Sequence, residues 1–379
     1  YTFPEAFLTD PGDPGGWQWI AQFIVIDGKM RGLFTLLFGA GMYLFMERAW
    51  ARGSTRWLQA WRLFVLLGFG LVHFYLIWFG DILAMYAMIG FAALAFMRFQ
   101  PGTQMRLGLF IYVLGAILLA GVFTIQYMIA ETGFGTSAEG LVTARQQILQ
   151  GMETTRADDA IFAQLTQTGD YAGLIAARFE KQWFLPFVNP LFFFLETLPL
   201  MLMGMALYRT GFFSGDYARE KMLRWGWAGV IVGAALHLAL GLFVKANGFG
   251  YFSANAAFIG WSMIPRLMMV LGLAALLVEA SKGATGWLAQ RVSAAGRAAF
   301  TNYLGTSVLM MVVFQGWGLG LFGDLNRPLL YLVVVLTCAL MLAWSKPWLD
   351  RFRYGPLEWL WRCLTYRRVF PIRREAPAG

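Results

Sequence analysis

The feature that most limits what this chain can fold into is a series of long, continuous apolar runs. A run of about 18 or more apolar residues can cross the hydrocarbon core of a bilayer, about 30 Å thick, as one helix. The runs do not alternate between apolar and polar residues, so they predict helices and not the strands of a membrane barrel. Composition agrees, because 59% of the 379 residues are hydrophobic and only 13% are charged. We therefore expect an all-α, polytopic bundle of transmembrane helices.

Nine spans are expected from the apolar runs that charged or turn residues bound. They cover residues 32–47, 61–79, 82–98, 106–130, 185–208, 225–246, 256–279, 298–322 and 329–345. The chain then divides into four parts. These are membrane helices with an extracytoplasmic start (1–130), an extracytoplasmic loop or cap (131–184), further membrane helices (185–345) and a basic, aromatic tail (346–379). A plain solvated connector is an equal alternative for the loop.

Alternate loops differ in their content of Lys and Arg, and this predicts the orientation of the bundle. Of the 30 Lys and Arg, 21 lie in one alternate set of loops together with the tail. Basic residues gather on the cytoplasmic side of membrane proteins, so nine spans with a cytoplasmic C-terminus satisfy the pattern. Topology thus explains the net charge of +9. We expect no nucleic-acid partner, because no basic, aromatic-studded face is present.

Motifs for metals and cofactors are absent from the sequence. Cys338 and Cys363 have no metal-site spacing and offer no plausible disulfide, and the chain has only two histidines. Gly318, Gly320 and Gly323 match a dinucleotide-binding pattern in form only, since no strand precedes them. No serine nucleophile elbow, Walker loop or zinc-binding helix occurs. We expect no bound cofactor and no metal.

Five ionisable residues lie within or at the end of apolar runs: His73, Asp81, Glu196, His237 and Arg266. Such residues cost about 2.5 kcal/mol or more each in a membrane helix, so they usually face a cavity. Counting about 1.5 Å per residue places four of them near the middle of the membrane or slightly outside it. They suggest one polar cavity in which Glu196 neutralises Arg266. The alternative is a structural ion pair, with histidines that only bond neighbouring helices.

His73 and Asp81 form the candidate catalytic pair, because a tight turn lets an imidazole and a carboxylate approach one another near the outer surface. Such a pair suits general base catalysis or a proton relay. Glu196, His237 and Arg266 are candidate substrate-binding residues, and Gln315 could join them. Pro265, beside Arg266, would loosen its helix and free carbonyl groups for the cavity.

Several short motifs spread over most of the chain are shared with a known family. They comprise Lys29 with residues 33–41, His73, residues 77–78, 80–83 and 86–87, residues 296–297, 301–304 and 314–323, residues 355–359, Arg362 and residues 364–366. In these residues the sequence resembles the YeiB-like family of bacterial membrane proteins, catalogued as domain of unknown function 418. Asn302, in one of these motifs, is counted as a further candidate substrate-binding residue. The family normally begins with one more transmembrane helix, which would make ten spans.

The resemblance implies a bacterial inner-membrane protein without a settled activity. The helical layout of the family is similar to that of membrane acyltransferases of the heparan glucosaminide acetyltransferase type. This implies an acyltransferase-like enzyme with a cytoplasmic donor, such as acyl-coenzyme A, and a small-molecule or envelope-glycan acceptor. No acyltransferase motif matches residue by residue, so His73 as base, oriented by Asp81, is a hypothesis from its own chemistry.

Two other functions remain open at this point. A transporter or exporter would use Glu196, His237 and Arg266 to line a path for a substrate or for protons. A noncatalytic scaffold would use residues 131–184 as its partner surface. In each case the lipid bilayer is the surrounding partner, and a homo-oligomer is compatible with the sequence.

Overall fold

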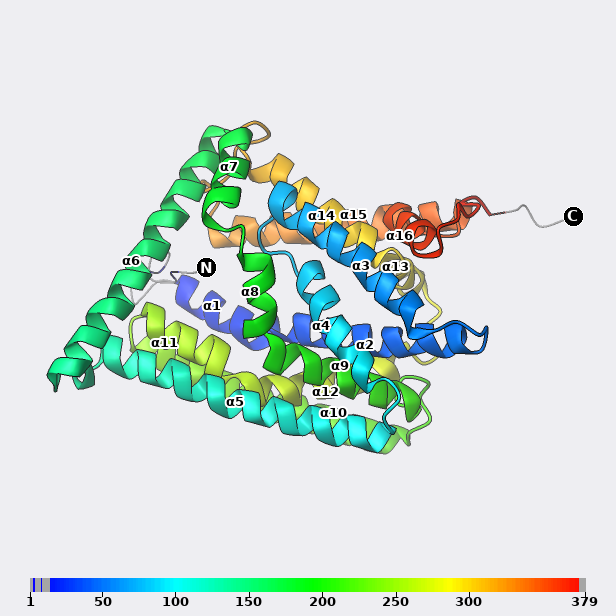
Figure 1. The fold of residues 1–379 in the computed structure, drawn as a ribbon, viewed down its shortest axis with the longest axis horizontal. Coiled ribbons are helices and arrows are strands. Elements are labelled where there is room, and N and C mark those ends of the chain that lie inside the picture. The colour runs from blue at the N-terminus through cyan, green and yellow to red at the C-terminus, as the bar shows by residue number, and fades with distance from the viewer. Residues whose placement is uncertain (1–2, 4–7, 9–13, 375–379) are drawn as a thin grey trace, which may run out of the picture. The chain divides into compact units, whose positions relative to one another are not determined.

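The computed structural model describes Phe3, Leu8 and residues 14–374. Most of the first 13 residues of the expected extracytoplasmic start, and residues 375–379 of the tail, lie outside the described residues. The described chain is helical and has no strand, apart from one antiparallel bridge between Phe352 and Arg373 (Figure 1). The expected all-α class is confirmed.

Contacts divide the chain into two compact units, each built from three separate stretches of sequence. Unit 1 comprises Tyr1–Phe45, Ala95–Ala160 and Phe192–Lys282. Unit 2 comprises Met46–Leu94, Ile161–Leu191 and Gly283–Gly379. Two long helices, α2 (Lys29–Trp50) and α6 (Glu139–Thr168), are divided between the units, and the last residues of α4 (Leu83–Phe96) and α8 (Leu185–Phe192) also belong to unit 1.

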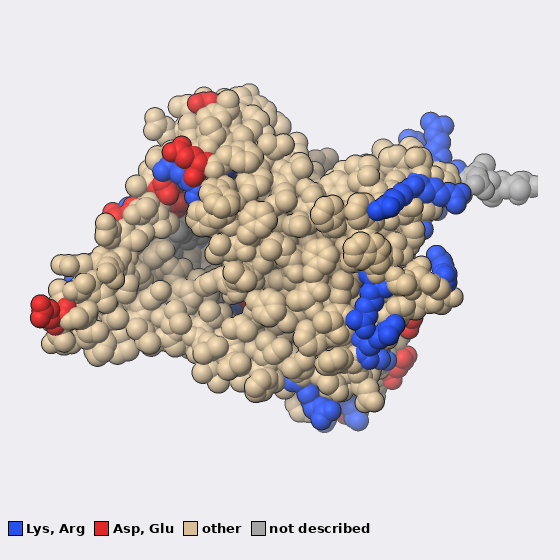
Figure 2. Space-filling model, in the orientation of Figure 1, with Lys and Arg blue, Asp and Glu red and all other residues tan. Residues whose placement is uncertain are grey.

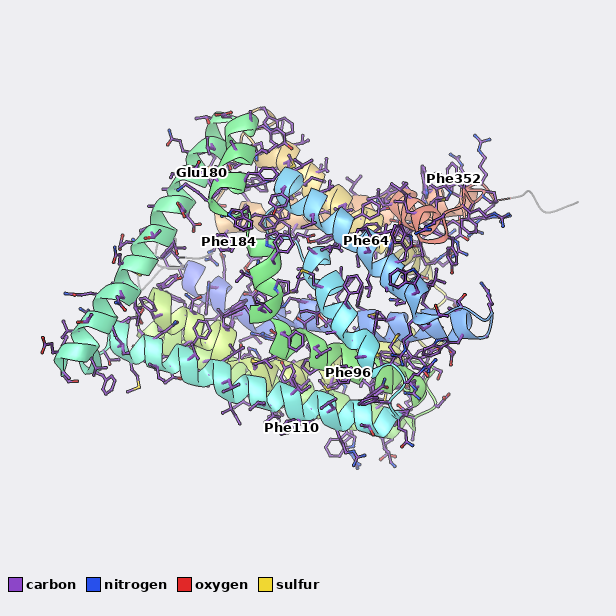
Figure 3. All side chains as sticks on the ribbon, viewed as in Figure 1. Phe64, Phe96, Phe110, Glu180, Phe184 and Phe352 are labelled. Carbon is purple, nitrogen blue, oxygen red and sulfur yellow. The ribbon has the colours of Figure 1, made fainter. Side chains whose placement is uncertain are left out.

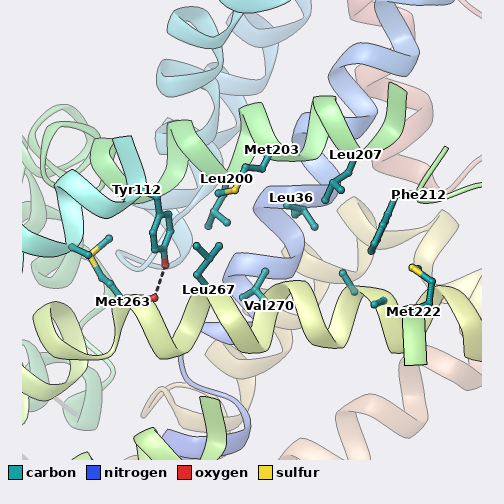
Figure 4. Close-up of a cluster of buried hydrophobic side chains, with 13 residues drawn as sticks. Leu36, Tyr112, Leu200, Met203, Leu207, Phe212, Met222, Met263, Leu267 and Val270 are labelled. Atoms are coloured by element: carbon teal, nitrogen blue, oxygen red, sulfur yellow. Dashed lines mark hydrogen bonds between the residues drawn. The ribbon is translucent and has the colours of Figure 1, made fainter. Parts of the chain in front are cut away.

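Unit 1 is organised around two pairs of packed helices, α10 on α12 and α5 on α9. Besides its part of α2 and α6, the elements of this unit are α1 (Pro14–Val25), α5 (Pro101–Glu131), η3 (Gly133–Thr136), α9 (Phe194–Arg209), α10 (Arg219–Ala246), α11 (Tyr251–Asn255), η4 (Ala256–Trp261) and α12 (Met263–Ser281). Figure 4 shows the buried core that these helices share, in which Leu36, Leu200 and Leu267 pack together. The Tyr112 hydroxyl donates to the Met263 carbonyl over 3.0 Å, so the buried phenol is paired.

Unit 2 is held by the packing of α13 on α15 and of α16 on α3. Its elements are α3 (Arg56–Val72), η2 (His73–Ile77), α4 (Leu83–Phe96), α7 (Tyr171–Lys181), α8 (Leu185–Phe192), α13 (Trp287–Arg297), α14 (Ala299–Phe314), α15 (Arg327–Arg351) and α16 (Pro356–Tyr366). A small core of Ala294, Ala298 and Leu349 lies against Trp344 and Trp348. The Trp361 indole donates to the carbonyl of Arg62, within α3, over 3.1 Å, which ties α16 to that helix.

Five helices of the described chain are long and apolar enough to cross a membrane, or six if the bent pair α8 and α9 counts as one span. They are Arg56–Ile77, Pro101–Glu131, Arg219–Ala246, Met263–Ser281 and Arg327–Arg351. All nine expected segments contain helix, but α4 has 14 residues and α14 has 16. These two are shorter than the roughly 20 residues of a straight span. The structure thus supports a helical membrane protein, and the count of nine stays a prediction.

The exposed faces of the long helices are apolar. Phe110 and Ile117 of α5 are each 65% exposed, and Phe110 lies on the outer side of its helix (Figure 3). The surface along α5 carries almost no charge, and Lys and Arg gather near its N-terminal end (Figure 2). A contiguous exposed apolar surface of this kind is unfavourable in water and marks contact with lipid.

Two glycines let α2 and α9 approach until their backbones touch. A Cβ atom on Gly39 would lie 2.1 Å from the Met201 carbonyl oxygen, and one on Gly204 would lie 1.9 Å from that of Leu36. Neither contact can be relieved by a side-chain rotation, because both partners are backbone atoms. Close approach through small residues is the usual means of packing membrane helices.

We expect Gly39→Ala to lower the free energy of unfolding by about 1–3 kcal/mol, because the added methyl group forces these helices apart. Gly41→Ala, on the same helix, is the matched control, since its Cβ would meet no atom within 4 Å. That change should be neutral or stabilising by up to about 1 kcal/mol through helix propensity. Thermal unfolding of both variants in detergent checks the prediction, and equal midpoints would contradict it.

Candidate functional site

The structure brings His73 and Asp81 together in unit 2. Nδ1 of His73 lies 2.7 Å from Oδ1 of Asp81, and their side chains are 0% and 1% exposed. The two residues are eight positions apart in the sequence. The pair therefore exists as a buried dyad formed by one local turn of the chain.

The ends of two helices position this dyad. His73 begins the π-helical turn η2, which closes when the Trp78 amide donates to the His73 carbonyl over 2.7 Å. Asp81 caps the start of α4, because its Oδ2 accepts from the Ala84 amide over 2.7 Å. A carboxylate is favoured at a helix N-terminus by both the hydrogen bond and the helix dipole. Gly70 lets α3 pass close to this cap, since a Cβ there would lie 2.3 Å from the Ala84 nitrogen.

Aromatic side chains surround the imidazole. The ring of Tyr303, on α14, has its centroid 5.1 Å from that of His73, and the Trp78 ring lies 6.1 Å away. The Tyr303 hydroxyl accepts from the Ile82 amide over 3.3 Å. Sequence reasoning did not select Tyr303 as a site residue, although it stands in one of the shared motifs. The phenol therefore places a polar group beside the dyad.

Hydrogen bonding assigns the tautomer of His73. With Nδ1 facing a carboxylate, the neutral ring carries its proton on Nδ1, which leaves a lone pair on Nε2. Nε2 is buried and has no hydrogen-bond partner in the described part of the chain. This arrangement can accept a proton from a group brought to Nε2, and Asp81 can stabilise the imidazolium that forms.

Part of the long loop 131–184 is fastened to the same end of α3. Arg178 of α7 donates to the carbonyls of Tyr75 and Ile77 over 3.1 and 3.3 Å, and the Tyr171 hydroxyl donates to that of Leu76 over 2.6 Å. The Tyr75 and Phe179 rings stack with centroids 4.5 Å apart. Burial lowers the pKa of the Arg178 guanidinium, and Tyr171 nearby opposes this shift. Consecutive carbonyls at the end of η2 are thus satisfied by α7.

We expect Arg178→Met to lower the free energy of unfolding by about 1–3 kcal/mol, because two carbonyls lose their donor. Glu180→Met is the control: it removes an exposed charge from the same helix (Figure 3) and should change stability by no more than about 0.5 kcal/mol. Thermal unfolding, together with limited proteolysis of residues 139–184, measures the difference. Identical behaviour of both variants would show that α7 is not held by Arg178.

A second polar cluster lies in unit 1 around Glu196. Its carboxylate accepts from Arg31 over 2.6 Å and from Arg266 over 2.8 Å. The Glu196 and Arg266 side chains are 6% and 2% exposed, whereas that of Arg31 is 24% exposed. The structure therefore places Glu196 against Arg266, as the sequence suggested. Arg31 was missed because it stands just outside the expected span 32–47.

The segment that precedes α12 supplies further hydrogen-bond partners for Arg266. Its guanidinium donates to Ser262 Oγ, between η4 and α12, over 2.7 Å, and also to the carbonyl of Phe258 within η4. Gly28, with φ of +74°, makes room for this group, because a Cβ there would lie 2.5 Å from Arg266 Nε. Lys29 is fully buried and donates to the Phe23 carbonyl. Sequence reasoning did not include Lys29 in the site.

His237 lies in unit 1 and is fully buried. Its Nδ1 is 2.7 Å from the Gly233 carbonyl, one turn back on α10, and its ring meets that of Phe23 edge-on at 5.1 Å. Nε2 finds no hydrogen-bond partner among the described residues. The bond to Gly233 fits a structural histidine, and Nε2 remains available for proton exchange.

The last two candidates lie in unit 2. The Asn302 amide donates to the Ala295 carbonyl and to Ser345 over 3.0 and 3.2 Å, and accepts from Trp344 over 2.9 Å. Gln315 is buried at the end of α14. The candidate residues thus fall into two sets, one in each unit, and their convergence on a single cavity stays a prediction. No group of three possible metal ligands occurs in the part of the chain that the structure describes.

The apolar helices and the ionisable side chains buried among them define the class: this is a polytopic α-helical membrane protein. Residues 207–368 match the family model of a protein of unknown function, DUF418. The chain is 29% identical to "Uncharacterized protein YxaH" of Bacillus subtilis, over 92% of this chain and 82% of that protein. It is 26% identical to "Uncharacterized protein YeiB" of Escherichia coli, over 98% and 92% of the two chains.

These findings confirm the resemblance to the YeiB-like, DUF418 family. A third relative, an "Uncharacterized 39.9 kDa protein in amylase 3'region" of Bacillus acidopullulyticus, is 26% identical over 93% of this chain and 85% of that protein. No solved structure matches the chain. The names of these relatives state no activity, so the similarity to acyltransferases stays a prediction.

Proposed function

We propose that this protein is a multi-pass bacterial inner-membrane enzyme that moves an acyl group from a cytoplasmic donor to an extracytoplasmic acceptor. One observation carries the proposal: the His73–Asp81 dyad is buried, and its Nε2 atom is free to act as a base. Positioned imidazoles of this kind contribute about 10²–10⁴-fold to reactions that begin with proton removal.

The proposed chemistry needs only this dyad and two substrates. His73 Nε2 takes the proton from an acceptor hydroxyl or amine, whose oxygen or nitrogen then attacks the acyl carbon of a thioester such as acyl-coenzyme A. A new C–O or C–N bond forms, the C–S bond breaks, and the proton passes from the imidazolium to the leaving thiolate. Asp81 holds the ring and stabilises its charged form, as carboxylates do in related acid–base systems. The acceptor class is an envelope glycan or another small molecule.

A topology of nine spans with a cytoplasmic C-terminus would place the basic loops, and with them the acyl donor, on the cytoplasmic side of the membrane. Contacts within unit 1 support this topology. Arg209 donates to the Phe99 carbonyl, and Lys282 donates to that of Gly215 over 3.2 Å. These bonds join the basic ends of α9 and α12 to the starts of α5 and α10. At the opposite ends, Glu131 accepts from the Phe252 amide over 2.8 Å. Basic residues thus share one end of the unit, as the positive-inside rule requires.

Acyl transfer is tested with the full chain in liposomes. Acyl-coenzyme A carrying a heavy-isotope acyl group is added on the cytoplasmic side, with envelope extract as the acceptor. We expect protein-dependent release of the coenzyme A thiol and a heavy acylated product by mass spectrometry. The same product should be missing from the envelope of cells that lack the gene. The proposal fails if no acylated species depends on the protein in either assay.

A transporter is the second candidate, favoured by the cluster in unit 1. Glu196, Arg31 and Arg266 form a buried ionic network next to the break between η4 and α12. Broken helices whose freed backbone groups meet ionisable side chains are the usual binding sites of secondary transporters.

For the transporter, we expect proton entry into proteoliposomes under an imposed pH gradient, followed with an internal pH-sensitive dye. His237→Gln should slow this entry at least about tenfold, because ionisable side chains buried in a membrane bundle are the groups that relay protons, and Nε2 of His237 has no hydrogen-bond partner among the described residues. Liposomes without protein provide the baseline. A flux equal to that baseline, or one that His237→Gln leaves unchanged, would count against proton-coupled transport.

A further inference from the structure

A basic cavity of about 470 Å³ lies between α13 and α15. Its lining includes Arg291, Lys346 and Arg351 but only one carboxylate, that of Asp350. Lys346 pairs with Asp350 at 2.6 and 2.7 Å, which leaves the other two cations as an excess of positive charge. Arg291 is held in place by its bond to the Leu342 carbonyl over 3.0 Å. The cavity therefore offers charge complementarity to an anion.

The helix that forms one wall has the character of a membrane-interface helix. In α13, Trp287, Leu288 and Val292 are 70%, 56% and 53% exposed, whereas Ala294 is buried. The Arg291 guanidinium lies 4.6 Å from the centre of the Trp287 ring. Short helices with an exposed apolar face, Trp and basic residues lie in the boundary between head groups and acyl chains.

An apolar groove of about 360 Å³ lies between α14 and α15, so α15 lines both this groove and the basic cavity. It extends from Thr301 and Trp344 to Val312 and Thr337. The stretch from Thr301 to Val312 covers about 16 Å at about 1.5 Å per residue, roughly half of a hydrocarbon core about 30 Å thick. On α15, the groove ends at Trp344, two residues before Lys346 of the basic cavity. One ligand with a charged head and an apolar chain matches both features.

We propose that this cavity binds the phosphate of an anionic phospholipid from the cytoplasmic leaflet, with one acyl chain in the groove between α14 and α15. Basic pockets between helices on the cytoplasmic side are suited to such head groups. Arg291 and Arg351 contact the phosphate, Lys346 turns toward it from Asp350, and Trp287 lies at the level of the glycerol. The site is separate from the His73–Asp81 dyad and does not depend on acyl transfer.

Lipid binding is measured on the purified full chain in detergent, by native mass spectrometry and by thermal unfolding with added lipid. Phosphatidylglycerol should bind and raise the midpoint, whereas phosphatidylcholine with the same acyl chains should not. Lys346→Gln with Arg351→Gln should weaken phosphatidylglycerol binding about 10- to 30-fold, since each basic residue near the surface contributes about fivefold. Arg219→Gln with Lys221→Gln, a pair of exposed basic residues of unit 1, is the matched control and should bind normally.

The groove is tested by Gly305→Leu. A Cβ on Gly305 meets no atom within 4 Å, so the new side chain can fill the groove without disturbing the helices. Gly121→Leu on α5 has the same open surroundings and is its control. We expect Gly305→Leu alone to weaken lipid binding while the midpoint without lipid stays unchanged. Equal effects of the two phospholipids, or equal losses in target and control variants, would overturn the proposal. A full effect of soluble glycerol phosphate would overturn a lipid as the occupant.

Discussion

Asp81→Asn is expected to reduce acyl transfer by about 10²–10⁴-fold while the protein stays folded. Asparagine caps a helix as well as aspartate does, so its oxygen can still accept from the Ala84 amide. Its nitrogen then faces His73 Nδ1 and donates to it. The imidazole proton must move to Nε2, which removes the lone pair that the reaction needs. Thiol release and acylated product, measured beside the thermal midpoint, separate the two effects.

Two further variants complete this test. Asp81→Ala removes both the cap and the partner of His73, so we expect the same loss of activity together with a loss of about 1 kcal/mol in stability. His73→Gln retains a polar side chain but has no basic nitrogen, and should be as inactive as Asp81→Asn. Wild-type rates in Asp81→Asn would mean that the dyad only joins two helix ends.

Glu196→Ala is expected to lower the free energy of unfolding by about 3–5 kcal/mol, the largest stability effect that we foresee. The change leaves Arg266, which is 2% exposed, without its carboxylate. Removing one partner of a buried pair is costly because the remaining charge stays desolvated. Thermal unfolding in detergent and the yield of monodisperse protein report the loss.

The exposed pair of unit 2 is the control for this change. Lys346 and Asp350 are 33% and 54% exposed at the side chain, so Asp350→Ala should cost no more than about 1 kcal/mol. A double change of Glu196→Ala and Arg266→Leu should recover part of the stability, because the guanidinium of Arg266 is then no longer buried without its carboxylate. Equal stability of Glu196→Ala and Asp350→Ala would show that water reaches the cluster in unit 1.

Apolar runs were sufficient to predict the helical class, because burial in lipid requires every backbone group to bond within its own segment. They were not sufficient to predict where helices end. The expected span 298–322 stops at Phe314, and Gly320 and Gly323 then take positive φ in the following turns. The helix α1 was not expected, since its 12 residues are too few for a span. In the structure it packs against α10.

In the candidate sites, contacts between residues close in the sequence could be predicted, whereas most contacts between distant residues could not. The approach of His73 to Asp81 could be predicted because eight residues and a turn determine it. Pairing of Glu196 with Arg266, 70 positions apart, was suggested by the need to neutralise charge. Tyr303 and Lys29 were missed as site residues, because nothing near them in the sequence shows which helix they face. Arg178 was missed for the same reason, since it looked like an ordinary loop cation.

The interleaved composition of the two units also sets an order of assembly during synthesis. Every stretch of unit 1 has been synthesised once Lys282 has been added, whereas unit 2 still lacks Gly283–Gly379. Units generally fold as they are completed from the N-terminal side. The Glu196 cluster can therefore form before α14 and α16, which pack against η2 and α3, have been synthesised. His73 can pair with Asp81 early, but it is enclosed by Tyr303 only near the end of translation.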